Sequence, residues 1–217
     1  MIDTGDTAWI LMSTALVMLM LPGLALFYGG LVRANNVLST FMHSFFGLAI
    51  VTVVWVIVGF SLAFGDSLGE LGIVGDPTQY AFFSGVGMEP AEGSTIPFVL
   101  FATFQMMFAA ITPALISGAF AERKRFAAFV VFTIAWSLLI YSPLAHMVWG
   151  GGILAELGAL DFAGGTVVHV ASGVSALVVA RVMGRRMRGH HVEPHDVPMT
   201  VLGAGLLWFG WFGFNAG

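Results

Sequence analysis

The sequence predicts an all-α, polytopic membrane protein. Its composition, the length of its apolar segments and the distribution of its charges all support that class. Hydrophobic residues make up 58% of the chain and charged residues only 9%, with a mean hydropathy of +0.93. Soluble domains carry roughly a quarter charged residues, so this chain has too few polar side chains to cover a soluble core. It contains no cysteine, which excludes disulfides, thiol nucleophiles and thiolate metal sites.

The apolar segments are each near or above the ~20 residues that cross a bilayer as a helix. Six are expected, at about 8–32, 37–64, 94–120, 126–147, 162–184 and 198–217. The first follows Asp3 and Asp6 with no basic residue before it, so it lacks the positive region of a signal peptide and is interpreted as a retained helix. The connection at about 65–93, rich in glycine, proline and acids, is expected to form a structured outer rim.

Charge segregates between the two sides of this alternating topology. All eight basic residues fall on one side: Arg33, Arg123, Lys124, Arg125, Arg181, Arg185, Arg186 and Arg188. Nine of the twelve acids fall on the other: Asp3, Asp6, Asp66, Glu70, Asp76, Glu89, Glu92, Glu156 and Asp161. Because basic loops stay in the cytoplasm, the N-terminus is predicted to lie outside.

The start of the fifth segment carries the first functional signal. Asp161 precedes two glycines and His169, and an uncharged apolar run continues to Arg181. An aspartate at this position is expected to cap the helix by accepting N–H groups of its first turn. At a rise of about 1.5 Å per residue, His169 lies about 12 Å below that end. An ionisable group within the hydrocarbon is a functional candidate.

Helical rise also places four aromatic residues above this histidine. Counted from the cytoplasmic ends of their helices, Phe104, Phe214, Phe108 and His169 lie roughly 28, 24, 22 and 18 Å up, with Trp149 at the outer boundary. Aromatic faces attract a small cation, rings below them block hydrated ions, and a histidine below can relay a proton. This order suits ammonium. Potassium would need a filter of carbonyl oxygens.

Each of these functional assignments has a structural alternative. Most of the 20 phenylalanines must face lipid or core, and Trp149 taken alone suits an interfacial anchor. Asp161 suits a structural cap better than a direct cation ligand. His43 and His146 are interpreted as interfacial or bonded to a carbonyl. The histidines of the 185–197 loop, His190, His191 and His195, are interpreted as solvated rather than metal-binding.

Several long motifs resemble one known family. They are FYGGLVRANNVLS (27–39), FQMMFAAITPALISGAFAER (104–123), AHMVWGGG (145–152), DFAGGTVVH (161–169) and GWFGFNAG (210–217). With them the chain resembles the ammonium transporters of the Amt/Mep/Rh family, in particular the bacterial Amt branch. The family fold is an inverted repeat of five plus five helices with one more helix at the end. The resemblance covers its first half plus one helix, so the chain is expected to be the N-terminal part and not to conduct alone.

The resemblance implies roles for the candidate residues. Trp149 and Phe108 would line an outer ammonium recruitment site, and Phe108 and Phe214 would form a phenyl gate with Phe104 beside them. His169 would be a pore histidine, and Asp161 would shape the site. The family implies a homotrimer in the cytoplasmic membrane, lipid around it and a PII-type signalling protein on its cytoplasmic face.

Other partners and classes are not expected. No cofactor, metal or nucleic acid is implied, and the helices contain no paired carboxylates or nucleophile–base set that would indicate an enzyme. The alternative function is an ammonium sensor, in which the same membrane fold signals through an attached cytoplasmic domain.

Overall fold

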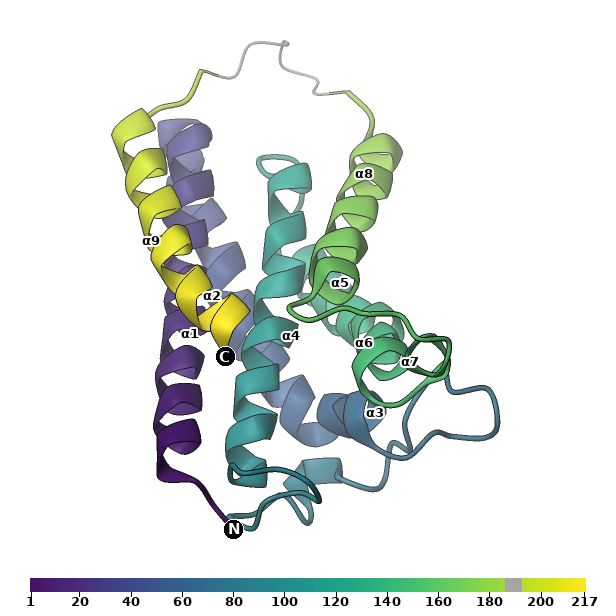
Figure 1. The fold of residues 1–217 in the computed structure, drawn as a ribbon. Coiled ribbons are helices and arrows are strands. Elements are labelled where there is room, and N and C mark those ends of the chain that lie inside the picture. The colour runs from purple at the N-terminus through teal and green to yellow at the C-terminus, as the bar shows by residue number, and fades with distance from the viewer. Residues whose placement is uncertain (186–192) are drawn as a thin grey trace.

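The computed structural model describes residues 1–185 and 193–217 as a bundle of membrane-length helices (Figure 1). Six helical spans in the described residues are long and apolar enough to cross a bilayer: Thr4–Leu31, Ala34–Phe64, Phe98–Phe120, Phe126–Glu156, Gly165–Met183 and Val197–Ala216. The prediction of an all-α protein with six such helices is therefore confirmed.

The bundle is built around α4 (Phe98–Phe120), which contacts α1 (Thr4–Leu31), α2 (Val37–Val54) and α8 (Ala171–Met183). Figure 1 shows α4 in the middle of the bundle. Two thirds of its most apolar stretch is buried, 67%, compared with 22% for the span that contains α8. Side chains on α4 are therefore the ones best placed to line an internal site.

Three spans contain a π-helical turn. These turns are η2 (Trp55–Gly59) between α2 and α3 (Phe60–Phe64), η4 (Ser137–Tyr141) between α5 (Phe126–Trp136) and α6 (Ser142–Trp149), and η5 (Gly165–Val170) directly before α8. A π turn adds one residue to a helical turn and changes the direction of every later side chain. Two of the predicted site residues, Trp149 and His169, follow or lie within such a turn.

Glycines let α9 (Val197–Ala216) lie directly against α1. A Cβ atom on Gly213 would come within 2.6 Å of Leu16 Cβ and 2.7 Å of the Ser13 carbonyl oxygen. One on Gly203 would come within 2.6 Å of the Gly23 carbonyl oxygen. Close backbone contact through small residues is the usual way for membrane helices to pack, and here it positions Phe214 near α4.

Hydrogen bonds tie the charged connections together at opposite ends of the bundle. At one end, Arg33 N donates to the Glu122 carboxylate (2.9 Å) and Arg123 Nη1 donates to the Gly184 carbonyl (2.7 Å). At the other end, the connecting segments contain two short elements, η3 (Ala81–Phe83) and α7 (Ile153–Glu156). There Ile153 N donates to the Gly72 carbonyl (2.9 Å). At the first end, Arg33 directly precedes the short helix η1 (Ala34–Asn36). Arg186 and Arg188 lie outside the described residues.

Candidate functional site

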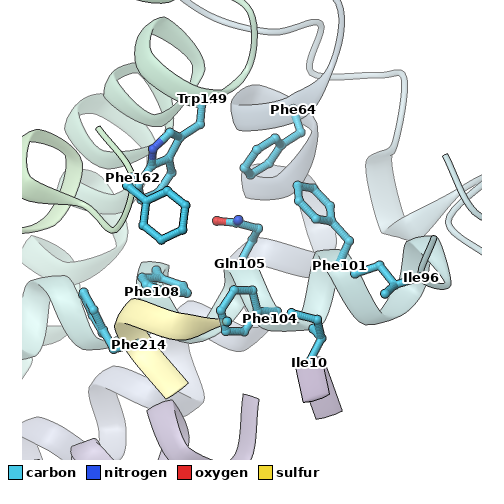
Figure 2. A pocket seen from close by; sticks show the side chains of 11 residues that line it. Ile10, Phe64, Ile96, Phe101, Phe104, Gln105, Phe108, Trp149, Phe162 and Phe214 are labelled. Atoms are coloured by element: carbon cyan, nitrogen blue, oxygen red, sulfur yellow. The ribbon is translucent and has the colours of Figure 1, made fainter. Parts of the chain in front are cut away.

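An aromatic cavity of about 320 Å³ lies beside the N-terminal half of α4. Its lining residues are Ile10, Phe64, Ile96, Phe101, Phe104, Gln105, Phe108, Trp149, Phe162, Phe214 and Gly217. Figure 2 shows these side chains turned toward one another from α4, α9 and the ends of the other helices. The cavity therefore contains all four aromatic residues that the sequence predicted for cation binding.

Phe108 is the centre of the aromatic contacts. Its ring centroid lies 4.6 Å from that of Phe214, 4.9 Å from that of Phe104 and 6.1 Å from that of Trp149. Phe104 and Phe108 meet because they are one helical turn apart on α4, and both are buried, with 7% and 3% exposure. The rings thus form a branched cluster, with Phe104 and Phe214 on different sides of Phe108, rather than a single file.

Trp149 is the last residue of α6 and is oriented by one hydrogen bond. Its indole N–H donates to the backbone carbonyl of Asp161 at 2.7 Å. Because that N–H is already used, the indole can offer a ligand only its ring. Such a ring face attracts small cations through its quadrupole.

The Asp161 carboxylate accepts four backbone N–H groups. Oδ1 accepts from Gly164 and Gly165, both at 2.7 Å, and Oδ2 accepts from Thr166 at 2.7 Å and Val167 at 3.1 Å. Helices leave the N–H groups of their first turn without internal partners, and here one side chain satisfies them. With both oxygens occupied in this way, the carboxylate acts on the backbone and not on the cavity.

The turn that Asp161 encloses requires a glycine at Gly164. Its φ is +91°, in the left-handed region that favours glycine. A Cβ atom there would also come within 2.6 Å of Val168 Cγ2 and 3.4 Å of the Trp149 ring. The Asp161 turn and the indole are therefore packed as one unit.

His169 lies on the π-helical turn η5 and is exposed on the described chain. Its ring centroid is 5.8 Å from that of Phe214. Phe214 therefore contacts Phe108 on one side and His169 on the other. The aromatic cluster and the histidine are thus continuous, from Trp149 through Phe108 and Phe214 to His169.

The other transmembrane histidines have different surroundings. His146 on α6 is fully buried; its Nε2 lies 2.9 Å from Ser67 Oγ and its Nδ1 lies 3.3 Å from the Ala63 carbonyl oxygen. This agrees with the interpretation of a carbonyl-bonded histidine. His43 is 2% exposed, and neither ring nitrogen has a hydrogen-bond partner in the described structure. It packs among Phe120, Phe126 and Phe129. The interpretation as a carbonyl-bonded histidine is therefore wrong for it.

Sequence reasoning missed part of the lining. Phe64 comes from the end of the second span, Phe162 from the loop before η5, and Phe101 and Gln105 from α4. Phe101 and Gln105 could have been found, because they lie three residues before Phe104 and Phe108, respectively, and so share their helix face. Phe162 had no such signal, since its direction depends on the loop.

No group of three or more histidine, aspartate or glutamate side chains suited to a metal occurs in residues 1–185 and 193–217. His190 and His191 lie outside that range.

Comparison with known proteins identifies relatives over nearly the whole chain. The profile of a family described as Ammonium Transporter Family matches residues 8–217. The chain is 54% identical to an ammonium transporter of Bacillus subtilis (98% of this chain, 52% of the relative). It is 48% identical to ammonium transporter Amt1 of Archaeoglobus fulgidus (98% of this chain, 52% of the relative).

Solved structures show the same fold. The crystal structure of Saccharomyces cerevisiae Mep2 superposes with a TM-score of 0.90 at 38% identity, covering 100% of this chain and 49% of that one. A structure described as "Sensor Amt Protein" superposes with a TM-score of 0.88 at 32% identity, covering 97% of this chain and 53% of that one. The chain therefore spans about half the length of the relatives that it matches.

Proposed function

The chain belongs to the ammonium transporter family, a family of transporters and not of enzymes, and we propose that it forms the outer recruitment site and gate of an ammonium transporter. The observation that carries this proposal is the continuous series of contacts from the Trp149 ring through Phe108 and Phe214 to His169. These contacts support a mechanism in which an aromatic cation site adjoins a hydrophobic barrier and a histidine assists the solute beyond that barrier.

Recruitment is assigned to the cavity beside α4. Trp149, Phe108 and Phe104 present ring surfaces to a cavity of about 320 Å³, and a cation over such a ring gains about 0.5–2 kcal/mol, depending on how far it is desolvated. The contribution of Asp161 is positional: its carbonyl fixes the indole and its carboxylate closes the turn that leads to His169.

Passage is assigned to the Phe108–Phe214 pair and the histidine beyond it. The two ring centroids lie 4.6 Å apart and both side chains are 3% exposed, and we assign to this pair the barrier between the cavity and His169. A charged ion would have to lose its water between two apolar rings, whereas neutral ammonia would not. His169 carries an imidazole, a side chain that can donate or accept a hydrogen bond and relay a proton, and we assign to it the role of assisting ammonia after the barrier.

The surroundings follow from the charge distribution and the family. We assign the basic end of the bundle to the cytoplasm, the N-terminus to the outside, and the protein to the cytoplasmic membrane. The complete protein is assigned a homotrimeric state and a PII-type signalling partner at its cytoplasmic face. Methylammonium is the expected transported analogue.

The test is uptake of radiolabelled methylammonium by cells that express the complete protein encoded by the gene. Uptake that unlabelled ammonium inhibits is expected. His169→Ala should reach the membrane in normal amounts and lose transport or ammonium selectivity. Absence of uptake by the unmodified protein at normal membrane levels would contradict the transport function. Unchanged selectivity in His169→Ala would remove the proton-handling role alone.

A sensor is the second candidate, favoured by the similarity to the solved "Sensor Amt Protein". In that case the same cavity would bind ammonium, and an attached cytoplasmic domain would signal. A kinase or cyclase domain in the coding sequence beyond residue 217 would favour sensing, and its absence would favour transport.

A further inference from the structure

One polar side chain in the aromatic cavity has no part in the function described so far. Gln105 lies on the face of α4 that carries Phe101, Phe104 and Phe108. Figure 2 shows its amide projecting into the space between Phe162, Phe64 and Phe101, with Trp149 above it. A glutamine is an unusual occupant of an aromatic face within a membrane-spanning helix, where polar side chains are costly and tend to be functional.

The side-chain carbonyl oxygen of Gln105 lacks a hydrogen-bond partner. Its Oε1 atom is buried and accepts no hydrogen bond from any group in the described structure. Buried polar atoms nearly always have partners, and leaving one unpaired destabilises the protein. An unpaired acceptor that lines a cavity is therefore best explained by a donor that enters the cavity.

The other polar group among the described lining side chains, the indole N–H of Trp149, already has a hydrogen-bond partner. The Trp149 indole N–H donates to the Asp161 carbonyl, and the other described lining side chains are aliphatic or aromatic, apart from Gly217, which has none. Gln105 thus supplies the free side-chain hydrogen-bonding group of this cavity among the described residues.

A dehydrated ammonium ion matches this arrangement. Its four N–H bonds point in tetrahedral directions, so ring faces can receive some of them while a directional acceptor receives another. An amide oxygen is such an acceptor, and hydrogen bonds from charged donors are roughly twice as strong as neutral ones. The terminal torsion of glutamine is broad, so the carbonyl can turn from its buried position toward the ion without a movement of α4.

We propose that Gln105 is a direct ligand of ammonium in the aromatic cavity, accepting one of its N–H hydrogen bonds through Oε1. The inference rests on the proposed function, and it adds a specificity-determining residue to it. Aromatic faces attract any small cation by charge, whereas the amide oxygen favours a cation that donates a hydrogen bond.

The experiment measures the initial rate of radiolabelled methylammonium uptake by proteoliposomes that contain the complete protein, with unlabelled ammonium as the competitor; the inhibition constant of ammonium is taken as its KM. Gln105→Leu removes the acceptor at similar volume and should raise the KM for ammonium roughly 10- to 100-fold, with a smaller change in the maximal uptake rate. Gln105→Glu keeps an acceptor and adds charge, so its KM should stay at or below that of the unmodified protein. Met106→Leu is the matched control, because Met106 neighbours Gln105 on α4 but does not line the cavity; its KM should not change.

Each other result counts against the proposal. A Gln105→Leu protein with unchanged KM overturns it while the proposed transport function stands. Equal KM increases in Gln105→Leu and Gln105→Glu, with lowered melting temperatures, would indicate a packing role and also overturn it. If Gln105→Leu does not fold, Gln105→Met replaces it under the same criteria. Absence of methylammonium uptake by the unmodified protein overturns the transport function itself, and the ligand role with it.

Discussion

Removal of the Asp161 carboxylate should destabilise the turn that carries His169 far more than an ordinary helix cap would. In Asp161→Ala the N–H groups of residues 164–167 lose both acceptor oxygens. In Asp161→Asn one oxygen remains, so about half of these bonds can persist. The Asp161 carbonyl that holds the Trp149 indole is a backbone atom and is present in both variants.

The magnitude follows from the number of bonds. A cap substitution costs about 0.5–2 kcal/mol, and a single hydrogen bond to a charged group contributes about 1.5–3 kcal/mol. Gly165 is exposed and Thr166 partly so, so water can replace some of these bonds and the contributions do not add. We expect a local loss of about 2–4 kcal/mol for alanine and about half of that for asparagine.

Amide hydrogen exchange on the complete protein measures this local stability. Because about 1.4 kcal/mol corresponds to a tenfold change, exchange in residues 164–170 should accelerate roughly 30- to 700-fold in Asp161→Ala. Asp3→Ala is the matched control, since the Asp3 carboxylate caps α1 through a single N–H, that of Asp6, at 2.9 Å. Unchanged exchange in residues 164–167 of Asp161→Ala, or an equally large effect of Asp3→Ala on α1, would refute the reasoning.

Three further predictions concern the cavity, the packing of the bundle and the loop that contains Asp76. Trp149→Leu removes the ring face and should raise the KM for ammonium about 2- to 30-fold in the methylammonium uptake assay; an unchanged KM would exclude a recruitment role. Gly213→Ala should lower the unfolding free energy by about 1–3 kcal/mol, because its Cβ would meet Leu16 and Ser13. A Cβ atom on Gly205 would enter open space, so Gly205→Ala should raise the unfolding free energy by up to about 1 kcal/mol. Melting temperatures that shift in the same direction in Gly213→Ala and Gly205→Ala would contradict this packing. Hydrogen bonds from the Thr78 hydroxyl and backbone N–H lower the pKa of Asp76 below its ordinary value of 3.8. The stability that these two bonds contribute to the folded protein is therefore complete above pH 3.8 and is lost as the pH falls through the folded-state pKa. Thr78→Val should move this pKa up, as read by an NMR titration of the carboxyl carbon, and no upward movement would exclude the hydroxyl as a cause.

The sequence predicted the membrane class because hydropathy and charge are properties of segments. Six apolar runs remain six apolar runs in any arrangement, so their number did not depend on tertiary structure. The pairing of Phe104 with Phe108 was also predictable, because both lie on one continuous helix and are four residues apart.

The rest of the site depends on geometry that a helical repeat of 3.6 residues does not contain. The π turn at Gly165–Val170 changes the direction of His169 by one inserted residue, and hydropathy does not register such an insertion. Phe162 reaches the cavity because Asp161 closes a loop around Gly164. Gln105 was within a quoted motif, but its significance lies in the absence of a hydrogen-bond partner, which only coordinates can reveal.

If the chain functions as proposed, selectivity against potassium follows from the same chemistry as ammonium binding. A potassium ion needs several oxygen ligands in place of its water, and the described lining side chains provide one amide oxygen, that of Gln105. Ring faces attract potassium but cannot replace its hydration shell, and the Phe108–Phe214 pair blocks an ion that keeps the shell. In the proposed function ammonium has an alternative that potassium lacks, because it can release a proton to water on the cavity side and leave the cavity as neutral ammonia. The apolar gate would then be a barrier to a permanent charge and a passage for ammonia, and His169, whose ring centroid lies 5.8 Å from that of Phe214, is the group to which we assign the contact with ammonia beyond the gate.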